Sequence, residues 1–186
     1  TQEQSLALLT SCLTHELTPK ELEQATTLAE TVGHLPLALE LAAAQISDGY
    51  TWDELLSGLQ EELEILDRWE AEDAPSEAKR KNYSLVASFN LSLKRLSAER
   101  LQLFAWLGVL PDDVTITEKM ATTLWDCSLT RARKNLRYLR GKALLLPGVS
   151  SEEGTNYRLH DFLHDLARSL LQSPPQSHYS SAGGRR

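Results

Sequence analysis

The amino-acid sequence predicts a mainly α-helical fold, in which a small four-helix bundle is followed by a winged-helix domain with a short β-hairpin. Two observations carry this prediction. Leucine and alanine recur at helical spacing through residues 1–65, where capping signals and glycines divide them into short helices. From residue 83 onward, further helical segments are followed by two strand-like runs around a polar loop, which is the element order of a winged helix.

The first two predicted helices precede residue 33. The stretch SLALLTSCL carries leucines at helical spacing and predicts a helix that ends near residue 15. The second helix begins at a capping box, in which Thr18 and Glu21 each satisfy a backbone N–H of the other. Pro19 takes the first helical position, where its missing N–H has no cost. Gly33 can adopt the left-handed conformation that ends a helix.

The third and fourth helices complete the predicted small helical domain at residues 1–65. The stretch LPLALELAAAQISDG is apolar on nearly every side, so its helix must be buried all round. Thr51 and Glu54 form a second capping box, which opens the fourth helix. Four leucines of that helix are predicted to face inward: Leu55, Leu56, Leu59 and Leu63. Residues 66–82 change from acidic to basic, which predicts a solvated linker.

The winged-helix domain is predicted at residues 83–172. Helical spacing predicts helices at 83–96, 98–107, 117–125, 130–140 and 161–171, and strand-like composition predicts strands at 143–146 and 157–159. Its core candidates are Phe89, Leu93, Leu96, Leu103, Phe104 and Trp106. Residues 173–186 are rich in Ser, Pro and Gly and predict a flexible tail. We therefore expect the chain to be part of a larger protein.

Composition limits the possible functions. The apolar fraction is 41% and the charged fraction 24%, which are the proportions of a soluble globular protein. A formal net charge of -7 argues against a surface built to attract nucleic acid or anionic lipid. Cys12 and Cys127 are too few for a disulfide framework or a zinc site. Since no signal peptide or membrane-spanning run is present either, we expect a cytoplasmic protein that does not bind membranes.

The sequence contains no complete catalytic motif. Gly141-Lys142 is followed by Ala143 and lacks the upstream glycine of a P-loop, so the chain alone cannot hold a nucleoside triphosphate in the usual way. A serine elbow, HExxH, CxxC and a dinucleotide glycine pattern are likewise missing. We therefore expect that this chain is not an enzyme by itself.

The stretch YRLHDFLHDLAR places two His-Asp pairs four residues apart, His160-Asp161 and His164-Asp165. On a helix the two histidines would lie near one face, and a metal site is one interpretation. The favoured interpretation is that Asp161 caps the last helix, which would hold His160 at a helix N-terminus. That position suits an anion, because backbone N–H groups and the imidazole can both donate hydrogen bonds. We predict no metal site.

Two further features allow a structural and a functional interpretation. In VGHLPLALELAAA, Gly33 and Pro36 can simply form a corner between helices, or Leu35 and Pro36 can present a flat apolar edge to a planar base. The helix at 130–140 is basic and could enter a major groove through four candidate residues: Arg133, Lys134, Arg137 and Arg140. On an acidic chain, a solvated face that pairs with acidic neighbours elsewhere in a larger protein is favoured over DNA binding.

Together, GHLPLALELAAA and YRLHDFLHDLA resemble the GLPLAL and MHD motifs of the NB-ARC class of STAND nucleotide switches. That class includes plant disease-resistance proteins, the apoptotic protease-activating factor and many bacterial signalling proteins. The order also matches, since a small helical domain bears the first motif and a winged-helix domain the second. The segment SLKRLSAERLQLFAWLGVLPDDVTITEKMATTLWD is similar to the opening of that winged-helix domain. The resemblance covers essentially the whole chain except the tail.

The resemblance implies roles for particular residues. Pro36 would pack on the adenine of a bound nucleotide, with Leu35 beside it and Gly33 shaping the turn. His160 would reach the β-phosphate of ADP and hold the winged helix closed, while Asp161 would fix the geometry of that turn.

The sequence departs from the family pattern at two positions. His34 stands where the family often has a second glycine, and Leu159 replaces Met. A bulkier residue at position 34 could alter the turn. The second pair, His164 and Asp165, is expected on the helix surface.

By this resemblance the chain is the regulatory lid of a signalling ATPase. ADP would bind between these modules and an upstream P-loop domain, keeping the intact protein closed and inactive, and exchange for ATP with Mg²⁺ would release the winged helix. The resemblance also implies a downstream repeat sensor domain and an oligomer on activation. Two alternatives stay open: a DNA-binding winged-helix regulator, which the net charge disfavours, and a protein-interaction module without a ligand.

Overall fold

The computed structural model describes residues 1–13, 15–69, 77–149 and 154–172. In this part of the chain the fold is mainly α-helical with one small antiparallel hairpin, as the sequence predicts. The chain forms two compact units: Thr1–Ala98 with Arg137–Leu145, and the described residues of Glu99–Leu136 with Leu146–Arg186. The predicted tail at 173–186, residues 70–76 of the predicted linker and residues 150–153 of the loop between the strands lie outside the described residues.

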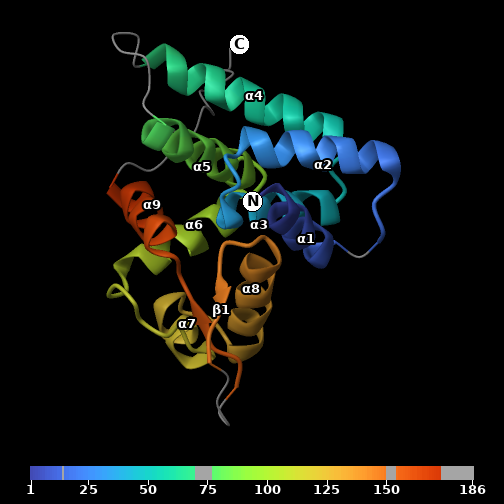
Figure 1. Cartoon of the computed structure of the whole chain (residues 1–186). Helices are drawn as coiled ribbons and strands as arrows, with labels where there is room; N and C mark the ends of the chain where they lie inside the picture. Colours follow the sequence, from blue (N-terminus) through green and yellow to red (C-terminus); the bar gives the residue numbers. More distant parts are fainter. Residues whose placement is uncertain (14, 70–76, 150–153, 173–186) are drawn as a thin grey trace, which may run out of the picture. The chain divides into compact units, whose positions relative to one another are not determined.

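The first unit contains five helices among its described residues: α1 (Gln2–Cys12), α2 (Pro19–Thr31), α3 (Pro36–Ser47), α4 (Trp52–Trp69) and α5 (Glu77–Leu93), drawn from blue to green in Figure 1. The predicted capping boxes at Thr18 and Thr51 are both formed. A third one, which the sequence analysis did not predict, joins Thr1 and Gln4 at the start of α1. Short-range capping therefore sets where several of these helices begin.

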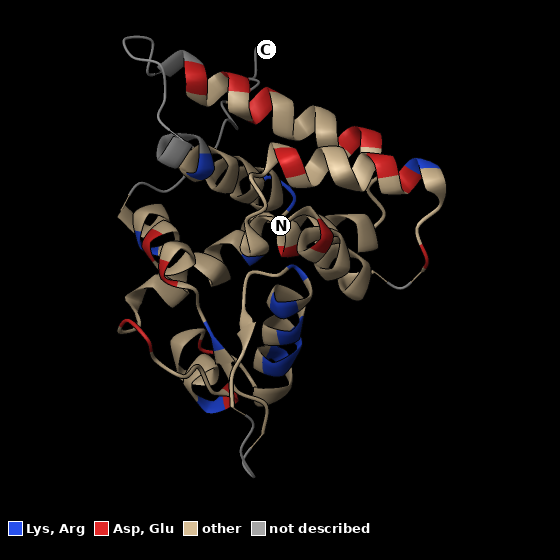
Figure 2. Ribbon diagram, in the orientation of Figure 1, with Lys and Arg blue, Asp and Glu red and all other residues tan. Residues whose placement is uncertain are grey.

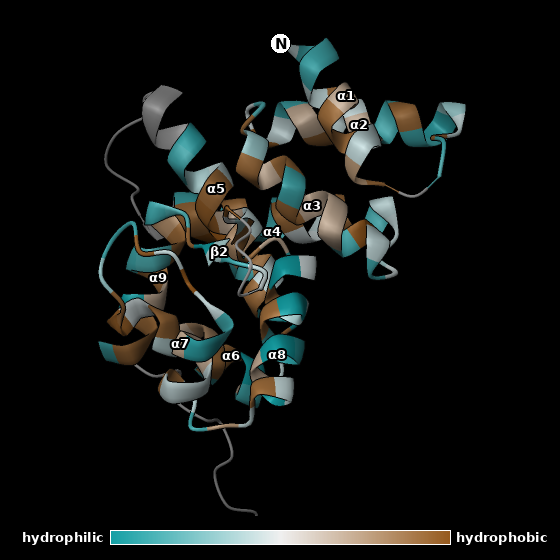
Figure 3. Cartoon of the chain, turned by 90° about the horizontal axis from the view of Figure 1, so that it is seen from below, coloured by the Kyte–Doolittle hydropathy of each residue, from teal (hydrophilic) through white to brown (hydrophobic). Residues whose placement is uncertain are grey.

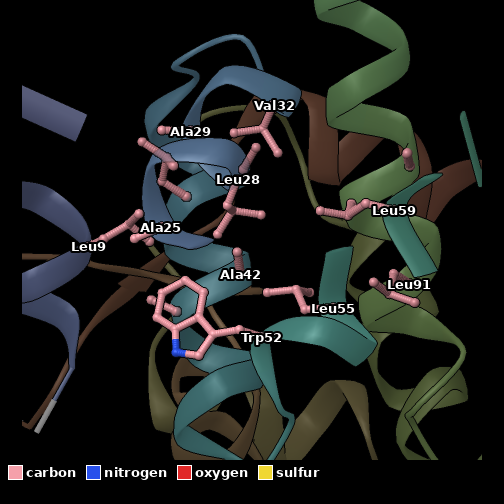
Figure 4. Close-up of a cluster of buried hydrophobic side chains, with 14 residues drawn as sticks. Leu9, Ala25, Leu28, Ala29, Val32, Ala42, Trp52, Leu55, Leu59 and Leu91 are labelled. Carbon is pink, nitrogen blue, oxygen red and sulfur yellow. The ribbon is translucent and has the colours of Figure 1, made fainter. Parts of the chain in front are cut away.

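Helix α3 is the central element of this unit, as its apolar composition predicts (Figure 3). It packs against α1, α4 and α5, and its buried residues are Ala38, Leu39, Leu41, Ala42, Ala43 and Gln45. Figure 4 shows the apolar cluster that α2 and α4 complete, in which Leu28, Leu55 and Leu59 are almost wholly buried. The predicted inward face of α4 is confirmed, since Leu56 and Leu63 are also partly buried against this cluster.

The second unit contains the remaining described elements. These are α6 (Ala98–Trp106), a 3₁₀ turn η1 (Leu107–Val109), α7 (Glu118–Leu124), α8 (Leu129–Gly141), β1 (Leu146–Pro147), β2 (Tyr157–Arg158) and α9 (Asp161–Gln172), with the last part of α8 belonging to the first unit. Strands β1 and β2 are antiparallel, with Leu146 opposite Arg158. Ile116, just before α7, forms a further antiparallel bridge with Tyr157. Sequence analysis does not predict this bridge, because a single residue has no periodicity.

The first predicted strand is largely wrong, since only Leu146 of residues 143–146 is a strand residue. Ala143 has a φ of 55° and ends α8 instead. Its N–H donates to the carbonyl of Arg140 and that of Leu144 donates to the carbonyl of Leu139, each at 3.0 Å. Ala143 to Leu145 are apolar because they are buried at a helix end, a burial that composition cannot distinguish from that of a strand.

Trp106 was predicted in the core and is 41% exposed. Its neighbours Phe104, Ala105 and Leu107 fill the buried face, which leaves Trp106 on the outer side of α6. The other core candidates are buried or partly buried. Two residues later, Gly108 lies directly against the backbone of Ala167 and Arg168 in α9, so close that a Cβ atom would clash. This contact fixes α9 on η1 within the second unit.

Candidate functional site

The corner between α2 and α3 is a complete Schellman motif. The N–H of His34 donates to the carbonyl of Ala29 at 2.8 Å, and that of Gly33 donates to the carbonyl of Glu30 at 3.0 Å. Gly33 has a φ of 63°, in the left-handed region that glycine adopts without strain. The chain thus turns sharply between the two helices, as the sequence predicts.

His34 keeps this turn although it is not a glycine. Its φ is 57°, a left-handed conformation that histidine adopts more readily than most side chains. The ring Nδ1 lies 3.1 Å from the hydroxyl oxygen of Ser5, a buried residue of α1. The bulkier residue therefore leaves the turn intact and adds a hydrogen bond between the corner and α1.

Leu35 and Pro36 follow at the start of α3. Leu35 is the N-cap residue and is partly buried against the core of the unit. Pro36 is the first helical residue and is exposed. Their apolar surfaces are therefore adjacent, and the proline ring is accessible to a planar ligand.

His160 lies at the start of α9, and its ring caps the helix. Its Nδ1 accepts a hydrogen bond from the backbone N–H of Phe162 at 3.2 Å, and its carbonyl accepts one from the N–H of His164 at 2.9 Å. Asp161 is the first residue of α9, so the prediction that Asp161 is the N-cap is wrong. Because Nδ1 is an acceptor here, the N–H of a neutral His160 ring is at Nε2, which is left to donate to a ligand.

Two hollows adjoin the start of α9. One, of about 240 Å³, is lined by Asp113, Leu146, Arg158, Leu159, His160 and Asp161. An anion in this hollow would meet the His160 ring and the Arg158 guanidinium as well as two carboxylates. The other, of about 270 Å³, is lined by apolar residues and by four carboxylates, those of Asp112, Asp113, Asp161 and Asp165.

His164 was predicted on the surface of the last helix and is only 5% exposed. Its Nε2 lies 2.7 Å from the carbonyl oxygen of Leu110, and its Nδ1 lies 2.7 Å from Oδ1 of Asp112. Helical spacing could have placed it inside, since His164 lies three residues before Ala167, a buried residue of the same helix. Asp165 is exposed, as predicted. In the described part of the chain, no group of three or more His, Cys, Asp or Glu is arranged to hold a metal ion.

The basic helix α8, banded in blue in Figure 2, is partly neutralised by acidic residues of the chain itself. Nε and Nη2 of Arg133 donate to the two carboxylate oxygens of Glu118 at 2.8 and 2.7 Å. Glu118 is 7% exposed, and its hydrogen bonds and charge raise the pKa of the Arg133 guanidinium. Arg131 pairs with Glu99 at 2.6 Å. Of the other candidate DNA-binding residues, Lys134 and Arg137 are exposed and Arg140 is partly buried.

Among the described residues, no helix has the length and apolar character to cross a membrane.

Comparison with known proteins gives a regulatory context. No family model matches the chain. The chain is 28% identical over 172 residues to the regulatory protein AfsR of Streptomyces coelicolor, a match that covers 91% of this chain and 16% of AfsR. It is also 28% identical over 176 residues to the regulatory protein AfsR of Streptomyces griseus, covering 94% of this chain and 17% of that protein. The chain thus spans about a sixth of the relatives that it matches, and the similarity is compatible with a regulatory role.

Proposed function

We propose that this chain is the regulatory lid of an NB-ARC-class nucleotide switch, which binds ADP together with a P-loop domain of a longer protein. The observation that carries the proposal is the state of His160. Its Nδ1 accepts the hydrogen bond of the helix cap, so a neutral ring carries its N–H at Nε2, where it can donate to a ligand. A hydrogen-bond donor at the N-terminus of a twelve-residue helix is suited to a phosphate group.

Pro36 and Leu35 are proposed to hold the adenine. The exposed proline ring and the adjacent leucine form an apolar edge that would cover one face of a planar base. The Schellman turn at Gly33 and His34 fixes where that edge begins. The similarity to regulatory proteins supports a role in control rather than in catalysis.

In this proposal the P-loop domain supplies the remaining nucleotide contacts and the Mg²⁺ site. ADP would stabilise the closed state of the intact protein because both modules of this chain contact it. Exchange for ATP would remove the His160 contact and shift the population towards an open, active state. A downstream repeat domain would sense the signal, and activation would produce an oligomer. By itself the chain is not an ATPase in this account.

Two substitutions in the intact protein test the proposal. His160→Ala removes both the cap and the donor, whereas His160→Asn retains an acceptor for the Phe162 N–H and shortens the side chain. Loss of one hydrogen bond to a charged phosphate predicts ADP dissociation that is faster by roughly 10- to 100-fold in both variants. The Asn variant is expected to keep the wild-type melting temperature. ADP dissociation that is unchanged in both variants would remove His160 from the site.

The DNA-binding alternative has less support. Arg133, one of its four candidate residues, donates two hydrogen bonds to Glu118 in a bidentate pair. Arg133 would have to break both hydrogen bonds to contact a base. Binding of duplex DNA that falls steeply with salt and weakens in Arg137→Ala would favour this alternative.

A further inference from the structure

The buried ring of His164 contacts an oxygen atom through each of its nitrogens. Nε2 lies 2.7 Å from the carbonyl oxygen of Leu110, and Nδ1 lies 2.7 Å from Oδ1 of Asp112. A carbonyl oxygen and an ionised carboxylate oxygen can only accept hydrogen bonds. A neutral imidazole has one N–H and can satisfy one of them, whereas a protonated ring satisfies both.

Several charged groups lie around the His164 ring. Asp112 and Asp113 come from the segment after η1, and Asp161 and Asp165 come from α9 itself; all four line the same hollow as the ring. Arg168 is the cation of this group, with Nη2 3.3 Å from Oδ1 of Asp112. The turn η1, which also packs on α9, carries no titratable residue. Arg158 lies near two of these carboxylates, in the adjoining hollow that Asp113 and Asp161 also line.

His164 lies one helical turn after His160, and the two residues are joined by the first hydrogen bond of α9. Its ring connects this part of the helix to Leu110 and Asp112, while Gly108 holds α9 one turn further on. The position of the first turn of α9 therefore depends on contacts made by the His164 ring.

We propose that His164 is a positioning residue, whose protonated ring holds the first turn of α9 against Leu110 and Asp112. When the ring loses its proton, His160 would hold its phosphate less firmly. The effect on phosphate rests on the function proposed above, whereas the contact between His164 and Asp112 does not. Loss of the proton would therefore make the nucleotide switch respond to pH.

The first experiment measures the ¹⁵N chemical shifts of the His164 ring nitrogens in the 186-residue chain as a function of pH. The expected result is a His164 ring protonated on both nitrogens at pH 6, which loses its proton at a lower pH in Asp112→Asn. Asp112 is exposed, so this variant is expected to fold. Asp165→Asn is the matched control. It removes a carboxylate that lines the same hollow, whereas the ion pair with the His164 ring is made by Asp112. A neutral His164 ring at pH 6, or equal effects of the two variants, would overturn the proposal.

The second experiment measures ADP dissociation from the intact protein between pH 6 and 8. The expected result is a rate that rises about tenfold with pH in the wild type and stays flat in His164→Gln. If the dissociation rate of the wild type does not change with pH although the ring is doubly protonated in the first experiment, only the link between His164 and His160 is overturned. An intact protein that binds no ADP would overturn the proposed function, and the NMR result would still decide whether the His164 contact exists.

Discussion

Replacing Gly108 with alanine tests the contact that holds α9 on η1. The added Cβ would lie 2.4 Å from the backbone nitrogen of Arg168 and 2.7 Å from the carbonyl carbon of Ala167. Ordinary contacts begin at 3.4 Å, so the two backbones must separate by about 1 Å. Because both contacted atoms are backbone, no side-chain rotation relieves the clash. We expect a loss of stability near the upper end for overpacking, about 3 kcal/mol.

Thermal unfolding followed by circular dichroism measures this effect. For a chain of this size, a loss of about 3 kcal/mol lowers the melting temperature by roughly 6–12 °C. Gly141→Ala is the matched control, because no atom lies within 4 Å of its added Cβ and alanine favours a helix. The control is expected to raise stability by up to about 1 kcal/mol. A Gly108→Ala variant that melts within about 2 °C of the wild type would refute the close packing of η1 on α9.

Three further predictions follow from the described contacts. Backbone and side-chain hydrogen bonds from Thr18 hold the pKa of Glu21 at about 2, so its contribution to stability is complete above about pH 4.5 and is lost as the pH falls towards 2. The stability difference between wild type and Glu21→Gln in urea unfolding should shrink over that range, and a difference that does not change with pH would contradict this assignment. Arg133→Ala removes the two hydrogen bonds and the positive charge that Arg133 supplies to the buried Glu118 carboxylate, and should cost about 2 kcal/mol in the same assay. The exposed Lys134→Ala should cost less than about 0.5 kcal/mol, and equal costs would contradict a structural role for the pair. The isolated 186-residue chain should not retain ADP through gel filtration, and tight retention would show that a P-loop domain is unnecessary.

The elements that the sequence predicted well are those set by residues close together in the chain. The capping boxes at Thr18 and Thr51 and the turn at Gly33 depend on partners within five residues, so composition and spacing reveal them. The buried character of α3 followed from its lack of a polar face. These local signals account for most of the first unit.

Two of the three features that the sequence did not predict depend on residues far apart. His164 is buried because Leu110, 54 residues earlier, accepts its hydrogen bond. Gly108 is required because the backbone of α9 passes against it, which no local pattern encodes. His160 rather than Asp161 caps α9 because the helix begins one residue earlier than capping by Asp161 requires, a difference within the usual uncertainty of helix ends. Long-range packing decides the first two features, whereas the cap of α9 is a local difference of one residue.

The central claim is that the α2–α3 corner and the start of α9 both contact a nucleotide in the intact protein. Amide hydrogen exchange measures this directly in the nucleotide-free, ADP-bound and ATP-bound states. The account predicts that ADP slows exchange at residues 37–39 and at 161–164, whereas ATP slows exchange only in the first segment. ADP that binds without slowing exchange in either segment would contradict the account.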